Sequence, residues 1–173
     1  MIITLVAVMS INNKLTQGSD STVADWASKA DGSFFKGLMA DHKVFIMGNT
    51  TYKVVKPKPS PEKLRIVMTR NPLSNENKQF PGQVEFSDSS PARIVSDLAK
   101  RGYEAALLLG GSEIYTLFLA AGLVDEMYLT VEPNIFGSGL NFVGALSHTL
   151  NYKLLKMHPL NDQGTVLLHY GKA

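Results

Sequence analysis

The stretch WASKADGSFFKGLM, residues 26–39, sets one acidic residue among apolar side chains near the start of a helical pattern. Positions i, i+3, i+4, i+7 and i+8 fall on one face of an α-helix. In this stretch they are occupied by Asp31, Phe34, Phe35, Leu38 and Met39. We therefore expect Asp31 on the helix face that packs against the core. A carboxylate there must be paired, protonated or functional, because an uncompensated buried charge is very costly.

The same stretch has a second explanation, in which Asp31 only caps the helix. Ser28, followed three residues later by Asp31, resembles a capping box with Ser28 as the N-cap. An acid in the first turn also suits the helix dipole. Cap and catalytic carboxylate both stay open at this level, and the helical phase favours the catalytic role. Trp26, the single tryptophan, precedes Asp31 by five residues and is expected to wall the same cleft.

Around this helix, apolar runs rich in β-branched residues alternate with helical patterns. The alternation predicts strands at 2–9, 44–48, 64–69, 83–86 and 105–111, and helices at 28–40, 50–55, 90–101 and 112–121. It indicates a parallel sheet, because parallel neighbours need a crossover long enough to hold a helix. Three later strands, within 125–136, 151–160 and 164–172, predict an antiparallel edge or hairpin. We expect an α/β fold in which residues 1–173 form a single domain: one mixed, mostly parallel central sheet with flanking helices and a C-terminal antiparallel hairpin.

The composition excludes several classes of protein. Seventeen basic and 15 acidic residues among 173 give a net charge of +2, without the Lys/Arg cluster typical of nucleic-acid binding. The chain has no cysteine, which excludes a thiol nucleophile, and its four histidines lack metal-ligand spacing, so no metal site is expected. The apolar N-terminal run is too short for a membrane span. We expect a cytoplasmic protein with a small-molecule substrate and no nucleic-acid or membrane partner, as a monomer or homodimer.

Three predicted strands end in residues that suit a bound phosphate. Glycine and small polar residues follow the strands in 47–52 (MGNTTY) and 109–115 (LGGSEIY), and Thr69 and Arg70 follow a third strand. Free backbone N–H groups and the helix dipole make such strand-to-helix turns natural phosphate sites. At any single turn, a role in turning and capping is the more economical explanation. Three turns in one sheet favour a dinucleotide, although the chain contains neither GxGxxG nor a P-loop motif.

Five motifs together resemble the dihydrofolate reductase superfamily over nearly the whole chain. They are W-x4-D-x3-F-K (Trp26, Asp31, Phe35, Lys36), VFIMG-x-x-T (44–51), Met68-Thr69, LLLGGSEIY (107–115) and LVDEMYLTVEP (123–133). The spacings around Asp31 are similar to those of dihydrofolate reductases proper. Residues 122–142 are similar to the related riboflavin-pathway reductase domain.

The resemblance implies an NADPH-dependent dihydrofolate reductase of tetrahydrofolate biosynthesis and one-carbon metabolism. It implies that Asp31, with Trp26 beside it, binds the pterin and assists protonation of N5 while hydride reaches C6. It also implies pterin and folate contacts from Ala7, Val8, Phe35 and Lys63, and it implies that Thr130 takes part by supporting Asp31 through a hydrogen bond or a water molecule. The implied cofactor-binding residues are Ala7, Gly48, Asn49, Thr50, Thr51, Thr69, Arg70, Gly110, Gly111, Ser112, Glu113, Ile114 and Tyr115.

An alternative within the same fold is a riboflavin-biosynthesis pyrimidinone reductase or another pteridine reductase. The basic residues that the resemblance implies for a phosphorylated substrate are replaced by DGSFFKGLMAD (31–41), which has one lysine, so the sequence favours folate. Lys63 stands where the family places an arginine for the folate tail, and lysine lacks the planar bidentate fork. Asn49 and Glu113 carry less positive charge than the family pattern near the expected 2′-phosphate of the cofactor. The preference between NADPH and NADH therefore stays open.

Overall fold

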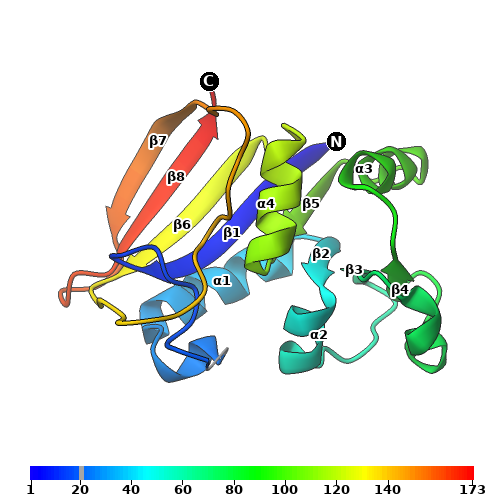
Figure 1. Ribbon diagram of the computed structural model, residues 1–173, viewed down its shortest axis with the longest axis horizontal. Coiled ribbons are helices and arrows are strands. Elements are labelled where there is room, and N and C mark those ends of the chain that lie inside the picture. Colours follow the sequence, from blue (N-terminus) through cyan, green and yellow to red (C-terminus); the bar gives the residue numbers. More distant parts are fainter. Residues whose placement is uncertain (20–21) are drawn as a thin grey trace.

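The computed structural model describes residues 1–19 and 22–173. Its strands form one eight-stranded sheet in the order β4-β3-β2-β5-β1-β6-β8-β7, with helices packed on it (Figure 1). The strands are β1 (Ile2–Ser10), β2 (Val44–Gly48), β3 (Leu64–Met68), β4 (Val84–Ser87), β5 (Ala105–Leu108), β6 (Glu126–Glu132), β7 (Tyr152–Pro159) and β8 (Val166–Lys172). The helices are η1 (Val23–Asp25), α1 (Lys29–Asp41), α2 (Asn49–Val55), η2 (Pro72–Lys78), α3 (Pro91–Lys100) and α4 (Ser112–Ala120).

The predicted fold class is confirmed: the sheet is mixed and mostly parallel, and it ends in an antiparallel hairpin. Strands β1 to β6 pair in parallel, whereas β8 runs antiparallel to both β6 and β7. Two details differ from the sequence-based expectation. The fifth strand ends at Leu108, because Gly110 adopts a φ of +91° that turns the chain out of the sheet. The first of the three late strands, β6, pairs in parallel with β1 on its other side.

The helices cover both faces of the sheet, as the continuous apolar strands predict. Helices α1 and α2 lie on one face, where Phe35, Leu38 and Tyr52 pack against buried side chains of β1 to β5. Helices α3 and α4 lie on the other face, where Ile94, Leu98, Ile114 and Phe118 join the larger apolar cluster. In Figure 1, α4 crosses in front of the sheet and α1 lies behind it. No helix in the described ranges is long and apolar enough to span a bilayer.

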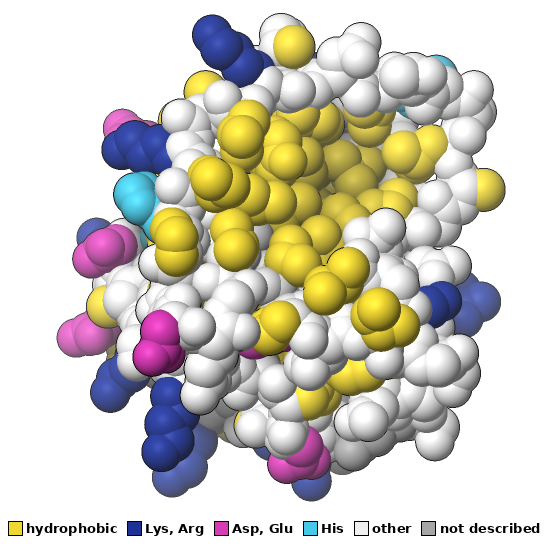
Figure 2. Space-filling model, turned by 90° about the vertical axis from the view of Figure 1, so that its left-hand side faces the viewer, with side chains coloured by type: hydrophobic (Ala, Val, Ile, Leu, Met, Phe, Trp, Pro, Cys, Tyr) yellow, Lys and Arg dark blue, Asp and Glu magenta, His cyan; other side chains and the backbone are white. Residues whose placement is uncertain are grey.

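The hairpin at the end of the sheet leaves apolar side chains uncovered. Leu154 and Met157 of β7 are 46% and 61% exposed, and they pair in register with Tyr170 and Leu168 of β8. On the side of the molecule where β7 and β8 lie, hydrophobic side chains line a hollow (Figure 2). Lys153 and Lys156 pair with Gly171 and His169 of β8 and so point to the opposite face, because the register of β7 shifts by one residue between Leu154 and Lys156.

Candidate active site

The first turn of α1 places Asp31 against the sheet. Ser28 is the N-cap, and its hydroxyl oxygen accepts a hydrogen bond from the Asp31 backbone N–H at 3.2 Å. Asp31 is only 8% exposed and is the one residue of α1 that is fully buried. The rest of the expected apolar face is half-buried: Phe34 meets Tyr128 with ring centroids 5.4 Å apart, and Phe35 packs on the core. The helix therefore presents its carboxyl group at the most enclosed point of its inner face.

The Asp31 carboxyl group has one hydrogen-bonding side chain on the sheet. Thr130 of β6, itself 2% exposed, bonds to it through its hydroxyl. Burial raises the pKa of Asp31 above its ordinary value, and the nearby Glu132 carboxylate raises it further. The Thr130 hydroxyl opposes this rise in the pKa by stabilising the ionised form. A carboxyl group in this setting can accept N–H donors from a ligand, and its raised pKa makes it a better proton donor than an exposed aspartate at the same pH.

In the structure, the carboxyl group of Asp31 does not take part in the helix cap. In a capping box, the acid at the third helical position accepts the N-cap backbone N–H. Here the Ser28 backbone N–H donates instead to Oε1 of Glu132 at 2.7 Å. Only the Asp31 backbone takes part in the cap. Its carboxyl group is therefore left for the cleft, so cap and catalytic carboxylate are compatible.

Strand β1 leaves an opening beside Asp31, because β5 and β6, its two neighbours in the sheet, pair with different residues of β1. Strand β5 pairs with residues 2–5 only, whereas β6 pairs with residues 4–10. The half of β1 that contains Ala7 and Val8 thus extends past the end of β5, and Val8 lies in register with Thr130. This is the point in an open α/β sheet where ligands bind. The structure therefore brings Asp31, Thr130, Ala7 and Val8 together.

Trp26 stands just before α1 and contacts the loop after β6. Its ring meets Phe136 edge to face, with centroids 5.1 Å apart. The indole Nε1 is buried and has no hydrogen-bond partner among the described residues. A buried N–H donor without a partner is costly, so this group is suited to a ligand or a bound water molecule.

Lys63 lies apart from this group. Its ammonium donates to the backbone carbonyl oxygens of Met39, Ala40 and His42 at 2.7, 3.2 and 2.8 Å, and so caps the C-terminus of α1. Three acceptors use all three of its protons. A substrate carboxylate at this position would have to displace these helix carbonyls, so the geometry gives no support to the expected folate-tail contact.

The expected cofactor residues lie along the carboxyl ends of neighbouring strands. The Gly48 N–H at the end of β2 donates to the Gly110 carbonyl beyond β5 at 2.7 Å. A Cβ on Gly48 would lie 2.9 Å from the Ile114 side chain, and one on Gly110 would lie 2.8 Å from the ring of Tyr115. Both positions therefore need glycine. Both glycines are buried, so they allow Ile114 and Tyr115 of α4 to pack directly against these two strand ends.

The turns that follow these strands carry the small polar residues. Thr51 of α2 lies opposite Gly111, where an added Cβ would be 3.7 Å from the threonine hydroxyl. Oδ1 of Asn49 is buried without a hydrogen-bond partner among the described residues, as is expected of an acceptor awaiting a ligand. Tyr115 is buried and donates its hydroxyl to the Val6 carbonyl, which fastens α4 to β1. Burial also raises the pKa of that hydroxyl.

The remaining expected residues sit around the same edge. Thr50, Arg70 and Glu113 are exposed, Ser112 begins α4, and Thr69 is tied to β4 by its N–H to the Ser87 carbonyl at 2.9 Å. Glu113 lies in the first turn of α4, where the helix dipole stabilises an acidic side chain. The negative charge of Glu113 would weaken the binding of an anion at the same helix end.

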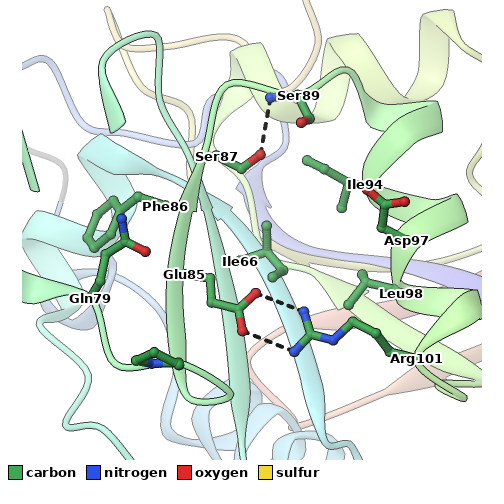
Figure 3. A pocket seen from close by; sticks show the side chains of 11 residues that line it. Ile66, Gln79, Glu85, Phe86, Ser87, Ser89, Ile94, Asp97, Leu98 and Arg101 are labelled. Carbon is green, nitrogen blue, oxygen red and sulfur yellow. Dashed lines mark hydrogen bonds and ion pairs between the residues drawn. The ribbon is translucent and has the colours of Figure 1, made fainter. Parts of the chain in front are cut away.

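A separate groove of about 340 Å³ lies between β4 and α3 (Figure 3). Glu85 and Arg101 cross it with hydrogen bonds of 2.8 and 3.0 Å, and that ion pair lowers the pKa of Glu85 against the effect of burial. None of the residues expected to bind substrate lines the groove, and β4 is at the opposite end of the sheet from β6 and β8. The groove is therefore separate from the group of residues around Asp31. Within the described residues no group of three or more His, Cys, Asp or Glu side chains is arranged to hold a metal ion.

Glu132 is the site residue that the sequence analysis missed. It is 2% exposed and lies two residues after Thr130, so both side chains point to the face of β6 that meets α1. The alternation within MYLTVE carried this signal, because an acid on the inward phase of a strand needs partners.

Comparison with known sequences identifies a family and an uncharacterised relative. The sequence model of the family described as dihydrofolate reductase matches residues 2–142. The uncharacterised protein YwjB of Bacillus subtilis (strain 168) is 25% identical over 156 residues, which are 86% of this chain and 86% of YwjB.

Solved structures share the fold at low sequence identity. A putative riboflavin biosynthesis protein from Shewanella sp. PV-4 has a TM-score of 0.81 and 20% identity, over 100% of this chain and 99% of that one. A diaminohydroxyphosphoribosylaminopyrimidine deaminase/5-amino-6-(5-phosphoribosylamino)uracil reductase from Thermotoga maritima has a TM-score of 0.78 and 17% identity, over 99% of this chain and 56% of that one. At these identities the likeness establishes the fold.

Proposed function

The chain belongs to the dihydrofolate reductase family, and we propose that it is a nicotinamide-dependent reductase of a ribosylamino-pyrimidine substrate of the riboflavin-pathway type. The observation that supports a reductase function is the carboxyl group of Asp31, which α1 buries against β6. It lies beside the half of β1 that extends past β5. A binding protein has no use for this costly group, whereas a reductase uses it to orient a nitrogen heterocycle and supply a proton.

The reaction adds hydride and a proton across a C=N bond. In the ring-opened form of a ribosylamino group, C1′ is doubly bonded to the exocyclic nitrogen of the pyrimidine. Reduced nicotinamide supplies hydride to C1′ when it is bound, and the nitrogen gains a proton, which leaves a ribitylamino group. Asp31 accepts N–H donors of the pyrimidine, and burial, which raises its pKa, favours the protonated form that can supply the proton. Thr130 fixes the orientation of the carboxyl group.

Neighbouring side chains hold the heterocycle and exclude water. Phe35 offers an apolar surface on the buried cluster that includes Val6, and Trp26 provides a buried N–H, unpaired among the described residues, for a ring oxygen or a bound water molecule. Ala7 and Val8 contribute the backbone of β1. Together these groups suit a flat ring with polar edges, in which hydrogen bonds fix the orientation and apolar contacts supply most of the burial.

The cofactor proposal rests on Oδ1 of Asn49, which is buried without a partner among the described residues, and on the position of the expected residues at the carboxyl ends of β2, β3 and β5. Gly48, Gly110 and Gly111 would admit the dinucleotide backbone, and the turns that begin α2 and α4 would receive its phosphates. Thr69 and Arg70 would lie on the adenosine side. Arg70 carries the only positive charge among the proposed cofactor residues, and Glu113 opposes it. We propose NADPH as the cofactor, with only modest preference over NADH.

Dihydrofolate reduction is the second candidate. The Asp31–Thr130 pair and the W-x4-D-x3-F-K spacing favour it, because a pterin presents an amino group and a ring nitrogen to one carboxylate. The position of Lys63 weighs against it. Its ammonium caps α1, which leaves the glutamate tail of folate without its expected partner. The Lys63 contacts, together with the riboflavin-biosynthesis proteins among the similar solved structures, make the pyrimidine substrate the leading proposal.

Both candidates are tested by one set of assays. Purified protein is mixed with NADPH or NADH and, in separate arms, with 5-amino-6-ribosylaminouracil 5′-phosphate, its 2,5-diaminopyrimidinone counterpart, and dihydrofolate. We expect loss of nicotinamide absorbance with a pyrimidine, and a product two hydrogen masses heavier by mass spectrometry. Turnover of dihydrofolate alone would reverse the ranking of the two substrates. Lack of turnover in every arm would overturn the proposed reductase function.

A further inference from the structure

Glu132 is a buried carboxylate whose two oxygens are engaged by different parts of the chain. Oε1 accepts the Ser28 backbone N–H at 2.7 Å, and Oε2 accepts the Thr165 hydroxyl at 2.6 Å. Glu132 is 2% exposed and Thr165 is 1% exposed. Among the described residues no lysine, arginine or histidine pairs with Glu132. A carboxylate held only by neutral donors is expensive to bury, so its role must lie in what it holds.

On one side, Glu132 secures the helix that carries Asp31. The N-cap N–H of α1 would otherwise lack an acceptor, because the Asp31 carboxyl group turns toward Thr130. Ser28 completes the cap by accepting the Asp31 backbone N–H. The first turn of α1 is thus attached to β6 at two adjacent points, Thr130 and Glu132, which share one face of the strand.

On the other side, Glu132 secures the turn between β7 and β8. Thr165 accepts a hydrogen bond from Nδ2 of Asn161 at 2.9 Å, and Oδ1 of Asn161 accepts the Thr165 N–H at 3.1 Å. The Leu160 N–H donates to the Thr165 carbonyl at 2.8 Å. Three segments far apart in sequence therefore meet at one carboxylate: the start of α1, the end of β6 and the β7–β8 turn.

We propose that Glu132 is a positioning residue, which fixes the first turn of α1 and thereby the Asp31 carboxyl group for the reaction proposed above. Its negative charge also acts on Asp31 directly, in the direction that favours the protonated acid. The other titratable groups on this face lie farther along the strands. Tyr128 is stacked on His169 at 4.2 Å, and His169 is paired with Glu126 at 2.9 Å. On α1, Lys29 is exposed.

Three variants separate the two effects of Glu132. Glu132→Gln keeps the size and an acceptor for Ser28 but removes the charge. Glu132→Ala removes both. Glu126→Gln is the matched control, because Glu126 lies on the same strand and the same face and bonds to His169 instead of α1. If Glu132→Ala does not fold, Thr165→Val replaces it, since this change removes the hydroxyl that donates to Oε2 and accepts from Nδ2 of Asn161.

The first readouts need no substrate, so they stand even if the proposed reaction fails. Carbon-13 NMR titration of the Asp31 carboxyl group should show a lower pKa in Glu132→Gln than in the parent protein. Amide exchange at Ser28 should accelerate about tenfold or more in Glu132→Ala, because its donor is left unpaired. Both quantities should match the parent in Glu126→Gln. If Glu132→Ala and Glu132→Gln behave like Glu126→Gln in both measurements, the proposal is overturned.

With an active substrate, the pH–rate profile gives a further test. A merely structural residue lowers activity equally at every pH. For Glu132→Gln we expect the descending limb of kcat to move to lower pH with little change in KM. For Glu132→Ala we expect KM to rise as well, by about tenfold, because α1 is no longer fixed. A uniform loss of kcat without displacement of the limb in either variant contradicts a role in positioning Asp31.

Discussion

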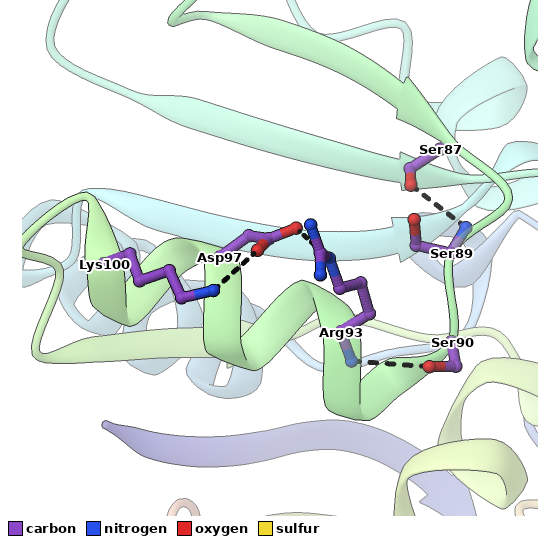
Figure 4. A network of polar contacts seen from close by, with 6 residues as sticks. All are labelled: Ser87, Ser89, Ser90, Arg93, Asp97 and Lys100. Atoms are coloured by element: carbon purple, nitrogen blue, oxygen red, sulfur yellow. Dashed lines mark hydrogen bonds and ion pairs between the residues drawn. The ribbon is translucent and has the colours of Figure 1, made fainter.

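Helices α1 and α3 both begin with a serine N-cap, yet they are held to the sheet in different ways. In α3, Ser90 accepts the Arg93 N–H at 3.4 Å (Figure 4). The helix buries Ile94 and Leu98. In α1 the cap extends to Glu132 of β6, and the one fully buried side chain is Asp31.

The difference shows what each helix contributes. Helix α3 has its own cap, an apolar stripe and exposed ion pairs from Asp97 to Arg93 and Lys100 at 2.7 and 3.8 Å, so its sequence accounts for its place. Helix α1 is held by polar contacts to distant strands and keeps a half-buried inner face. That arrangement leaves a surface for a ligand beside Asp31, at a cost in burial that a purely structural helix avoids.

The strongest test of this contrast is removal of the α1 carboxylate. Asp31→Asn should lower kcat for the pyrimidine substrate at pH 7 by about 100-fold or more, because the general acid is lost while the hydrogen bond to Thr130 can be kept. Steady-state kinetics measure the effect, and circular dichroism checks the fold. Activity within threefold of the parent would remove Asp31 from the mechanism.

The same variant should be more stable than the parent at neutral pH. Burial raises the pKa of Asp31 in the folded protein above its unfolded value. Folding therefore favours the protonated form, and the stability from this group is complete below the unfolded pKa and is lost as pH rises through the folded pKa. Asparagine does not ionise and avoids that loss. Thermal unfolding of the variant and the parent across pH 3–8 measures this difference in stability. The prediction is contradicted if the variant becomes less stable than the parent as the pH rises.

Truncation of the inner faces should separate the helices by stability. Leu98→Ala in α3 should cost about 2–5 kcal/mol of unfolding free energy, because Leu98 is 1% exposed in the core. Leu38→Ala in α1 should cost less, since Leu38 is only half-buried. Urea denaturation of both variants gives the comparison. Equal costs would mean that α1 is anchored by apolar packing like α3.

The two caps offer a smaller and closely matched pair. Ser28→Ala and Ser90→Ala should each cost about 1 kcal/mol of unfolding free energy, the usual value for a lost N-cap hydroxyl. Only Ser28→Ala should also reduce turnover, because it frees the Asp31 backbone N–H. Parallel urea titrations and kinetic assays distinguish them. A similar loss of activity in Ser90→Ala would show that the effect is not specific to α1.

The smallest effect is expected on the exposed surface of α3. Arg93→Ala breaks an i,i+4 ion pair whose side chains are 63% and 43% exposed. Such pairs contribute about 0.3–0.5 kcal/mol and are screened by salt. Unfolding at low and high ionic strength should show this difference at low salt only. A cost above 1 kcal/mol that persists at high salt would point to packing by the arginine stem.

Much of the fold could be predicted because the relevant signals are local. The apolar runs at 2–9, 44–48 and 64–69 identify strands within one or two residues of their ends. The helical periodicity of residues 31–39 correctly predicted that Asp31 points toward the core. The end of β5 was misplaced because an apolar run continues through Leu109, whereas the backbone leaves the sheet at a positive-φ glycine.

The contacts of the site were harder to predict, because they join distant residues. Lys63 was assigned to a substrate carboxylate by its position in a motif, but it reaches the carbonyls that end α1. Glu132 had no assigned role, because a capping box is sought three residues away and not 104 residues away. Backbone groups at helix ends accept any suitable partner, whatever its distance along the chain.

The sequence by itself determined the alternating α/β order, the family motifs and the inward phase of Asp31, because each depends on the period of a strand or helix. Only the tertiary structure decided that Glu132 holds the N-cap of the helix that carries Asp31, that Lys63 is occupied, and that β1 opens beyond β5. The physical reason is that burial and hydrogen-bond pairing arise from packing between segments. The charge state of a carboxyl group depends on that packing, and no local pattern records it.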